Sequence, residues 1–181
     1  MRLFHVSEEA DIEVFEPRVP YRKDIDDSAG LVWAISEERL HNYLFPRDCP
    51  RISCYPVEQT DVNDIIRIIG PSSANSIVAV ESKWMPEILR KELYIYEFDV
   101  TNFELQDACA GYYVSKELEE PIAVTKIDNI LEALLNRDIE LRIMPSLWGL
   151  RDEVVDSTLN YSCIRMGYAT PRDVTEGGQH E

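Results

Sequence analysis

The 181-residue chain has few basic residues and no long apolar run, and both shortages limit what the protein can do. Lysine and arginine number 18 against 34 acidic residues, which gives a formal net charge of −16. A field of that sign repels nucleic-acid phosphates and anionic membrane surfaces, so we expect neither as a partner. No apolar run approaches the roughly 18 residues that a membrane-spanning helix needs. We therefore expect a cytoplasmic protein with no membrane association.

Sequence signals for metal, redox and nucleophilic chemistry are also missing. The spacing of the cysteines matches no zinc or redox motif, so we expect reduced thiols in or near the core; they are Cys49, Cys54, Cys109 and Cys163. Three scattered histidines and no clustered carboxylates argue against a metal site. The chain has neither a glycine-rich phosphate loop nor a nucleophile elbow. Its N-terminus lacks the pattern of a signal peptide, and we expect none. No cofactor is firmly indicated.

What the chain does contain is an ordinary globular composition, with 45% apolar and 29% charged residues. Its length fits one domain with a sizeable core, which we place at residues 1–168. Residues 169–181 hold Gly177, Gly178 and little apolar content, and we expect a frayed tail. Residues 8–30 contain two prolines and an acidic run, which predicts a long loop of the kind often found in lids and binding sites.

Short predicted strands outnumber short predicted helices, and no internal repeat is present. The strands are expected at 3–7, 31–35, 52–55, 77–80, 93–98, 112–115, 121–127, 139–144 and 161–166. The helices are expected to start near the capping residues Ser36, Thr60, Ser82 and Asp128, and a further one over 145–158. Residues 99–111 are expected to form a loop. This layout predicts an α+β fold with sheets as the frame.

His5 and Ser7 form a polar pair in the first strand. Their equal parity places both on one face, while Phe4 and Val6 point to the other. Two polar groups on the inward face of a sheet either satisfy each other and the nearby backbone or hold a ligand. Pattern alone leaves both readings open.

Several stretches resemble the ADP-ribosyltransferase-like fold of poly-ADP-ribose polymerases, mono-ADP-ribosyltransferases and RNA 2′-phosphotransferases. They are Leu-Phe-His-Val-Ser (3–7), Val-Trp-Ala-Ile (32–35) with Tyr-Leu-Phe (43–45), Leu-Tyr-Ile-Tyr-Glu-Phe-Asp (93–99) and Gly-Tyr-Tyr-Val-Ser (111–115). The opening Leu-Phe-His-Val-Ser-Glu-Glu and the corner Tyr-Leu-Phe-Pro-Arg-Asp-Cys-Pro-Arg are also similar to a family of uncharacterised bacterial proteins. The resemblance implies split sheets with short flanking helices.

The resemblance also implies an NAD or nucleotide pocket with possible catalytic residues His5, Ser7, Tyr43 and Tyr112. His5 would bind a ribose hydroxyl, Ser7 would hold the nicotinamide side, and Tyr43 would stack on the nicotinamide ring. Where the fold commonly has a glutamate, this chain has Tyr112. A neutral phenol cannot stabilise a developing cation as a carboxylate does. The implied activity, ADP-ribosyl transfer from NAD as substrate, therefore lacks its usual charged group.

Arg47 and Arg51 complete the expected nucleotide-binding set with His5, Ser7 and Tyr43. Both could hold a phosphate or carboxylate, or could simply pair with Asp48 and other acids. Weaker expectations concern other side chains. Arg2 is a minor candidate for the binding site, and strand alternation lets only one of Tyr112 and Tyr113 face a pocket. The three tryptophans are expected in the core, and His41 is expected to be exposed on its helix.

Three functions therefore compete. The first is a protein with an ADP-ribosyltransferase-like pocket that binds NAD or another small nucleotide and transfers ADP-ribose, or acts on an ADP-ribosylated or 2′-phosphorylated substrate. The second is a non-catalytic module on the same fold that binds a ligand or a protein, which the missing glutamate favours. The third is a hydrolase that uses His5 as acid and base, without a visible carboxylate partner. The sequence does not indicate an oligomeric state.

Overall fold

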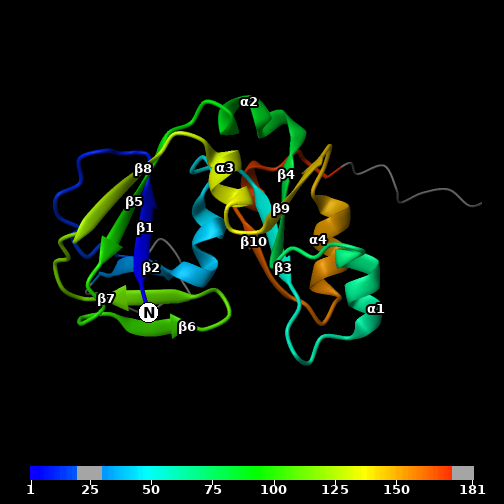
Figure 1. Ribbon diagram of the computed structural model, residues 1–181, viewed down its shortest axis with the longest axis horizontal. Helices are drawn as coiled ribbons and strands as arrows, with labels where there is room; N and C mark the ends of the chain where they lie inside the picture. Colours follow the sequence, from blue (N-terminus) through cyan, green and yellow to red (C-terminus); the bar gives the residue numbers. More distant parts are fainter. Residues whose placement is uncertain (20–29, 173–181) are drawn as a thin grey trace, which may run out of the picture.

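Two sheets lie on either side of a shared core in the computed structural model, which describes residues 1–19 and 30–172 (Figure 1). The six strands of the first sheet are antiparallel and follow the order β6 (Glu104–Asp107), β7 (Tyr112–Ser115), β2 (Val32–Ser36), β1 (Leu3–Ser7), β5 (Leu93–Phe98) and β8 (Ala123–Ile127). The four strands of the second follow the order β10 (Asn160–Ile164), β3 (Arg51–Tyr55), β4 (Ser76–Glu81) and β9 (Ile139–Met144), with β4 and β9 parallel.

The helices are short and connect or cover the sheets. They are the 3-10 helix η1 (Glu37–Tyr43), α1 (Val62–Asp64) with the π-helical η2 (Ile65–Ile69), η3 (Ser82–Trp84) with α2 (Met85–Ile88), α3 (Ile130–Leu135), α4 (Trp148–Val155) and η4 (Met166–Tyr168). This arrangement confirms the α+β class. The finer likeness to ADP-ribosyltransferases stays a prediction. Within the described residues, no helix has the length and apolar character that a membrane span requires.

Three local predictions are wrong for reasons that the structure makes clear. Strand β6 lies inside the segment 99–111 that was predicted to be a loop. The prediction missed it because all four of its residues are exposed and show no apolar pattern. Asp61, not Thr60, caps α1: its carboxylate accepts from the Asn63 N–H, while the Thr60 hydroxyl accepts from Val57. Likewise Asn129, one residue after the predicted cap, accepts from the N–H of Glu132 and begins α3.

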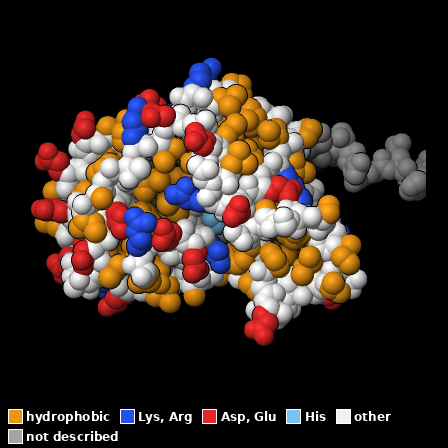
Figure 2. Space-filling view, viewed as in Figure 1, with side chains coloured by type: hydrophobic (Ala, Val, Ile, Leu, Met, Phe, Trp, Pro, Cys, Tyr) orange, Lys and Arg blue, Asp and Glu red, His pale blue; other side chains and the backbone are white. Residues whose placement is uncertain are grey.

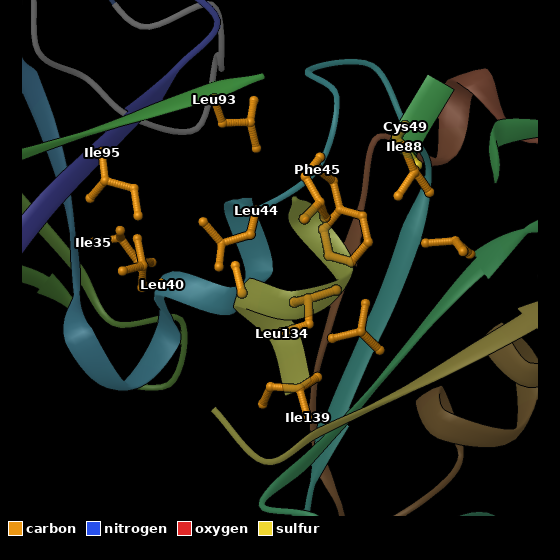
Figure 3. Close-up of a cluster of buried hydrophobic side chains, with 14 of the residues drawn as sticks. Ile35, Leu40, Leu44, Phe45, Cys49, Ile88, Leu93, Ile95, Leu134 and Ile139 are labelled. Carbon is orange, nitrogen blue, oxygen red and sulfur yellow. The ribbon is translucent and has the colours of Figure 1, made fainter. Parts of the chain in front are cut away.

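The central core fills the space between the sheets (Figure 3). Ile35, Leu93 and Ile95 come from the first sheet and Ile139 from the second, while Leu40, Leu44 and Leu134 come from the segments between them. A second core lies on the other face of the second sheet, under η2 and α4. A third covers the other face of the first sheet and includes Leu3 and Phe98, with Phe15 packed against it. The first sheet is therefore covered on both faces.

The C-terminal residues through Arg172 are held against the second sheet. The Glu81 carboxylate is fully buried at the end of β4 and accepts hydrogen bonds from the N–H and hydroxyl of Thr170. The Trp148 indole N–H donates to the Thr170 carbonyl at 2.7 Å. The expected frayed tail thus does not include residues 169–172. The rest of it, 173–181, lies outside the described residues, as do residues 20–29 of the expected long loop.

Candidate functional site

His5 lies on the outer face of the first sheet. Its Nδ1 donates to the Trp33 carbonyl at 3.1 Å, and its ring centroid is 4.9 Å from that of Phe15. A carbonyl can only accept, so Nδ1 carries the proton and Nε2 of the neutral ring is an acceptor. Burial lowers the pKa of His5, and the charges of Arg47 and Arg18 lower it further against the opposing hydrogen bond. The imidazole is therefore neutral near pH 7.

Ser7 shares that face but makes a local contact. Its hydroxyl accepts from the Glu9 N–H at 3.1 Å, which forms a turn at the end of β1. The predicted equal parity of His5 and Ser7 is thus kept. Both side chains are hydrogen-bonded to backbone groups, which agrees with the interpretation that the polar pair is satisfied by its surroundings and holds no ligand.

Tyr43 and Tyr112 lie on the opposite face of the sheet. The strand register pairs Phe4 with Ile35 and Ile35 with Tyr112, so these three side chains share the inner face. Tyr112 and Tyr43 both pack against the central core. The structure therefore does not place the four predicted catalytic residues in one pocket: the phenols are separated from His5 and Ser7 by the sheet itself. The expectation of a single pocket around all four is corrected accordingly.

The two phenols meet where β7 approaches η1. The hydroxyls of Tyr43 and Tyr112 are hydrogen-bonded to each other, and their ring centroids are 6.2 Å apart. The half-buried Trp33 ring lies edge-on to Tyr112 at 5.7 Å. The Arg51 guanidinium of β3 lies 5.5 Å from the ring centroids of both Tyr43 and Phe45. These five side chains bring both sheets together, and we call them the seam cluster.

Arg51 is the most unusual member of the seam cluster. It is 2% exposed, and its Nε and Nη1 donate to the carbonyls of Asn42 and Cys49 at 2.5 and 2.7 Å. Among residues 1–19 and 30–172, no carboxylate forms an ion pair with it. Burial lowers its pKa to about 10, so the group stays cationic at neutral pH. A buried cation held by neutral carbonyls alone makes this part of the seam electropositive.

The tyrosine pair supplies hydrogen bonds but no base. Burial raises the pKa of Tyr43, and the adjacent Tyr112 raises it further. Tyr43 therefore stays protonated at neutral pH, and its phenol can donate, accept and offer a flat ring. The cluster has neither an activated nucleophile nor a titrating acid, so its chemistry suits binding better than bond cleavage.

A second contact between the sheets lies beside this cluster. The Tyr55 hydroxyl donates to the Cys109 carbonyl at 3.0 Å and accepts from the Asn160 amide at 3.1 Å. The Arg39 guanidinium lies 3.6 Å from the centroid of the Tyr55 ring. Arg165, with a left-handed φ of 55°, lies 4.0 Å from the Asp48 carboxylate. Its charge lowers the pKa of both Arg51 and Tyr43, so it adds to the positive potential.

Sequence reasoning missed Arg39, Tyr55 and Arg165. They come from η1, β3 and the turn after β10, and no local spacing links those segments. A lone arginine near a glycine, as at Arg165-Met166-Gly167, is the only signal, and it is a weak one. Their proximity depends on how the two sheets pack, which no local pattern encodes.

The remaining predicted site residues lie elsewhere. The exposed Arg47 uses its backbone N–H to bind the Glu8 carboxylate at 2.9 Å, and its charge acts on His5 rather than on Arg51. The two expected nucleotide-binding arginines therefore have different surroundings: Arg47 is exposed near Glu8, and Arg51 is buried in the seam cluster. Arg2 forms ion pairs with Glu97 at 2.7 Å and Glu37 at 2.8 Å.

Other residue-level expectations are partly wrong. His41 is buried, with 4% exposure, and not exposed on its helix. Its Nε2 and the Asn42 Oδ1 are buried without a hydrogen-bond partner among the described residues. Cys49 and Cys54 are buried as expected, whereas Cys109 and Cys163 are exposed thiols. Within the described part of the chain, no group of three or more potential ligands could hold a metal ion.

The fold and the seam cluster define the class of protein: a two-sheet α+β protein with a polar, aromatic contact between its sheets. More specifically, the chain belongs to DUF6886, a family of unknown function, whose match covers residues 4–169. No curated protein and no solved structure matches the chain significantly. The matched range includes every member of the seam cluster.

Proposed function

We propose that this protein binds a small anionic ligand at the seam between its two sheets. Arg51 would supply the charge, and the Tyr43–Tyr112 pair would supply hydroxyl groups and aromatic surface. The proposal rests on one observation: a guanidinium that is 2% exposed has no carboxylate partner among the described residues.

The lack of a carboxylate partner for Arg51 within residues 1–19 and 30–172 is informative because acids are abundant in this chain. There are 34 acidic residues for 18 basic ones, so a counter-charge could have been provided from many positions. A buried charge is costly unless it is paired or fully hydrogen-bonded. The two carbonyl contacts use only two of the five N–H groups of Arg51. An anion from solution would complete this partial compensation, and Arg165 would add to its attraction.

The aromatic groups favour a ligand that also carries a flat ring. Tyr43, Tyr112 and Trp33 present edges and faces next to the buried cation. A nucleotide has both chemistries, because its phosphates suit a guanidinium and its base suits an aromatic face. An NAD-type dinucleotide, which the sequence resemblance implies, is thus the first ligand to test.

The geometry favours binding over ADP-ribosyl transfer. His5 and Ser7 lie across the sheet from the phenols, and Tyr112 is a neutral group where transfer chemistry needs a carboxylate. A non-catalytic ligand-binding module is therefore the better supported of the earlier alternatives. Hydrolysis by His5 gains no support from a ring whose Nδ1 is bound to a backbone carbonyl.

The test is a titration of the full chain with NAD, ADP-ribose, pyrophosphate and nicotinamide, by calorimetry and thermal shift. We expect ADP-ribose or NAD to bind and to raise the melting temperature, because a ligand that binds only the folded state stabilises it. Arg51→Lys, which keeps the charge but loses the planar fork, should weaken binding about tenfold. Tyr112→Phe should weaken it by a smaller factor, about threefold, because one hydroxyl is lost.

Arg2→Lys provides the matched control, since it makes the same change at an exposed arginine outside the seam. The Arg2→Lys protein should bind each compound with the affinity of the wild type. The proposal would be rejected if none of the four compounds bound at millimolar concentration, or if Arg51→Lys and Tyr112→Phe folded normally and bound as tightly as the wild type. In either case Arg51 serves only to hold the chain around Asn42 and Cys49.

A further inference from the structure

Strand β8 ends the first sheet and has a free outer edge. In Figure 1 it lies at the side of the sheet that faces away from α1 and α4. Within residues 1–19 and 30–172, no strand pairs with that outer side. The N–H of Ile122 donates to the Glu97 carbonyl of β5 at 2.8 Å. The even-numbered residues of β5 bond β1, so its odd-numbered residues face β8 and form hydrogen-bonded pairs with Ala123, Thr125 and Ile127. The N–H groups of Val124 and Lys126 therefore point away from β5.

Apolar side chains accompany this free edge. Leu118 is 62% exposed, Ile122 is 64% exposed and Val124 is 48% exposed. Val124 pairs with Tyr96, which is fully buried beneath Phe15, so the cover of the outer face ends between β5 and β8. We call Leu118, Ile122 and Val124 the aliphatic strip. An exposed strand edge beside exposed aliphatic residues is a template for pairing with another chain.

The surroundings of the aliphatic strip are strongly acidic. The chain segments on either side meet at the bridge between Phe15 and Glu119. Their exposed acids are Glu8, Glu9, Asp11, Glu13, Glu16, Glu117 and Glu120. The only cations in residues 8–19 and 116–120 are Arg18 and Lys116. Figure 2 shows acidic side chains along the corresponding side of the molecule, with apolar side chains among them.

We infer that the β8 edge binds an extended segment of a partner protein, in which aliphatic side chains alternate with lysine or arginine. The segment would add a seventh strand to the sheet through the outward N–H and C=O groups of β8. Its aliphatic side chains would cover the aliphatic strip, and its cations would meet the acidic rim. A second copy of this chain would bring the same acids against themselves, so charge disfavours self-pairing.

The opposite edge of the sheet shows how this protein blocks an edge. Strand β6 has only four residues, contains a register shift and carries Glu104 and Asp107. Short, irregular and charged edge strands resist pairing. Strand β8 has five residues in regular register with β5, and its one charged side chain, Lys126, is neutralised by ion pairs with Glu92 at 2.7 Å and Asp128 at 2.6 Å. The difference between the two edges supports a binding role for β8 alone.

The test uses a labelled peptide of about nine residues in which valine and lysine alternate, with fluorescence anisotropy as the readout. The wild-type protein should bind it, and binding should weaken as salt is added because the attraction is partly electrostatic. Lys126→Pro removes an outward N–H without touching the β5 ladder and should weaken binding at least about tenfold. Lys126→Ala loses the same ammonium group but keeps that N–H, so it should bind at least as tightly as the wild type.

Val124→Lys is a second variant that does not depend on proline being tolerated. It places a cation on the half-exposed aliphatic strip and should also weaken binding about tenfold. Far-UV circular dichroism and melting temperatures establish that each variant is folded. The inference is overturned if the peptide does not bind at about 1 mM, if a valine–glutamate peptide binds equally well, or if the folded Lys126→Pro and Val124→Lys proteins bind like Lys126→Ala. These outcomes are independent of ligand binding at the seam, which the variants do not touch.

Discussion

His41 is a buried imidazole on η1 whose protonation opposes folding. Burial lowers its pKa to about 4, and the charges of Arg39 and Arg137 contribute in the same direction. In the unfolded chain the same group takes up its proton near pH 6.5. Between these values the unfolded state binds more protons than the folded state, so stability falls as the pH is lowered from about 6.5 to about 4.

We expect His41 alone to account for about 3 kcal/mol of this loss, from a pKa difference of about 2.5 at 1.36 kcal/mol per unit. Urea denaturation at several pH values between 7 and 4 measures it. His41→Gln should make the profile shallower over that range, and the buried His5, whose pKa is also lowered, should account for part of the slope that remains. Asp64 does not interfere, because its folded pKa of about 2 places its loss of stability below pH 4. Equal pH profiles for the wild type and His41→Gln would contradict the prediction.

At the residue scale, the sequence predicted the face of the strand on which a side chain lies better than it predicted which residues surround that side chain. The parity of His5 and Ser7 follows from strand geometry alone, and the meeting of Tyr43 with Tyr112 agrees with the resemblance. Which face of the sheet looks toward the second sheet depends on topology, so the phenols were assigned to the wrong neighbours. His41 failed similarly, because apolar spacing marked only one face of η1 as buried.

At the scale of elements, Gly111 fixes the turn that leads into β7. Its φ is +70°, and a Cβ atom there would lie 2.5 Å from the Ser36 hydroxyl and 2.7 Å from the Arg39 Cγ. Gly70 has a similar φ of +69° but nothing within 4 Å of a Cβ position. Both glycines occupy the left-handed region that L-residues avoid, yet only Gly111 is also crowded.

This contrast predicts different costs for the same substitution. Gly70→Ala should lower the free energy of unfolding by about 1–3 kcal/mol from backbone strain alone, because its φ of 69° and ψ of −142° lie in a region that residues other than glycine avoid. Gly111→Ala should lower it by about 2–4 kcal/mol, because the clash with η1 and the end of β2 adds to that strain. Urea denaturation of both variants measures the difference. Equal losses would show that the neighbours of Gly111 move aside freely.

Elements with a strong apolar pattern were predictable, and polar ones were not. The run Ile77–Val80 predicted a buried strand, and β4 is buried along its whole length. Strand β6 has no such run and forms only because it pairs with β7. The caps of α1 and α3 were each misplaced by one residue, because neighbouring residues such as Asp128 and Asn129 can both accept a hydrogen bond.

At the scale of the whole molecule, the two sheets share one core. Residues of both sheets and of η1 and α3 belong to the same cluster of buried side chains. The sequence predicted the α+β class but not the strand order, because β1 lies between β2 and β5 only through long-range pairing. The same long-range packing creates the seam cluster, which explains why the sequence indicated only part of it.

A shared core predicts that the two sheets unfold together, because loss of either would expose the apolar surface of the other. Leu134 is 1% exposed at the centre of that core, and Leu134→Ala should lower the free energy of unfolding by about 2–5 kcal/mol. Leu135, its neighbour on α3, is 67% exposed, and Leu135→Ala should change the free energy of unfolding by less than about 0.5 kcal/mol.

Tryptophan fluorescence shows whether the two sheets unfold together: Trp33 reports on the first sheet and Trp148 on the helix beside the second. Single-tryptophan proteins that keep only one of these residues should unfold at one common urea concentration, and Leu134→Ala should shift both transitions equally. Separate midpoints, or a shift confined to one reporter, would mean that the sheets are independently stable.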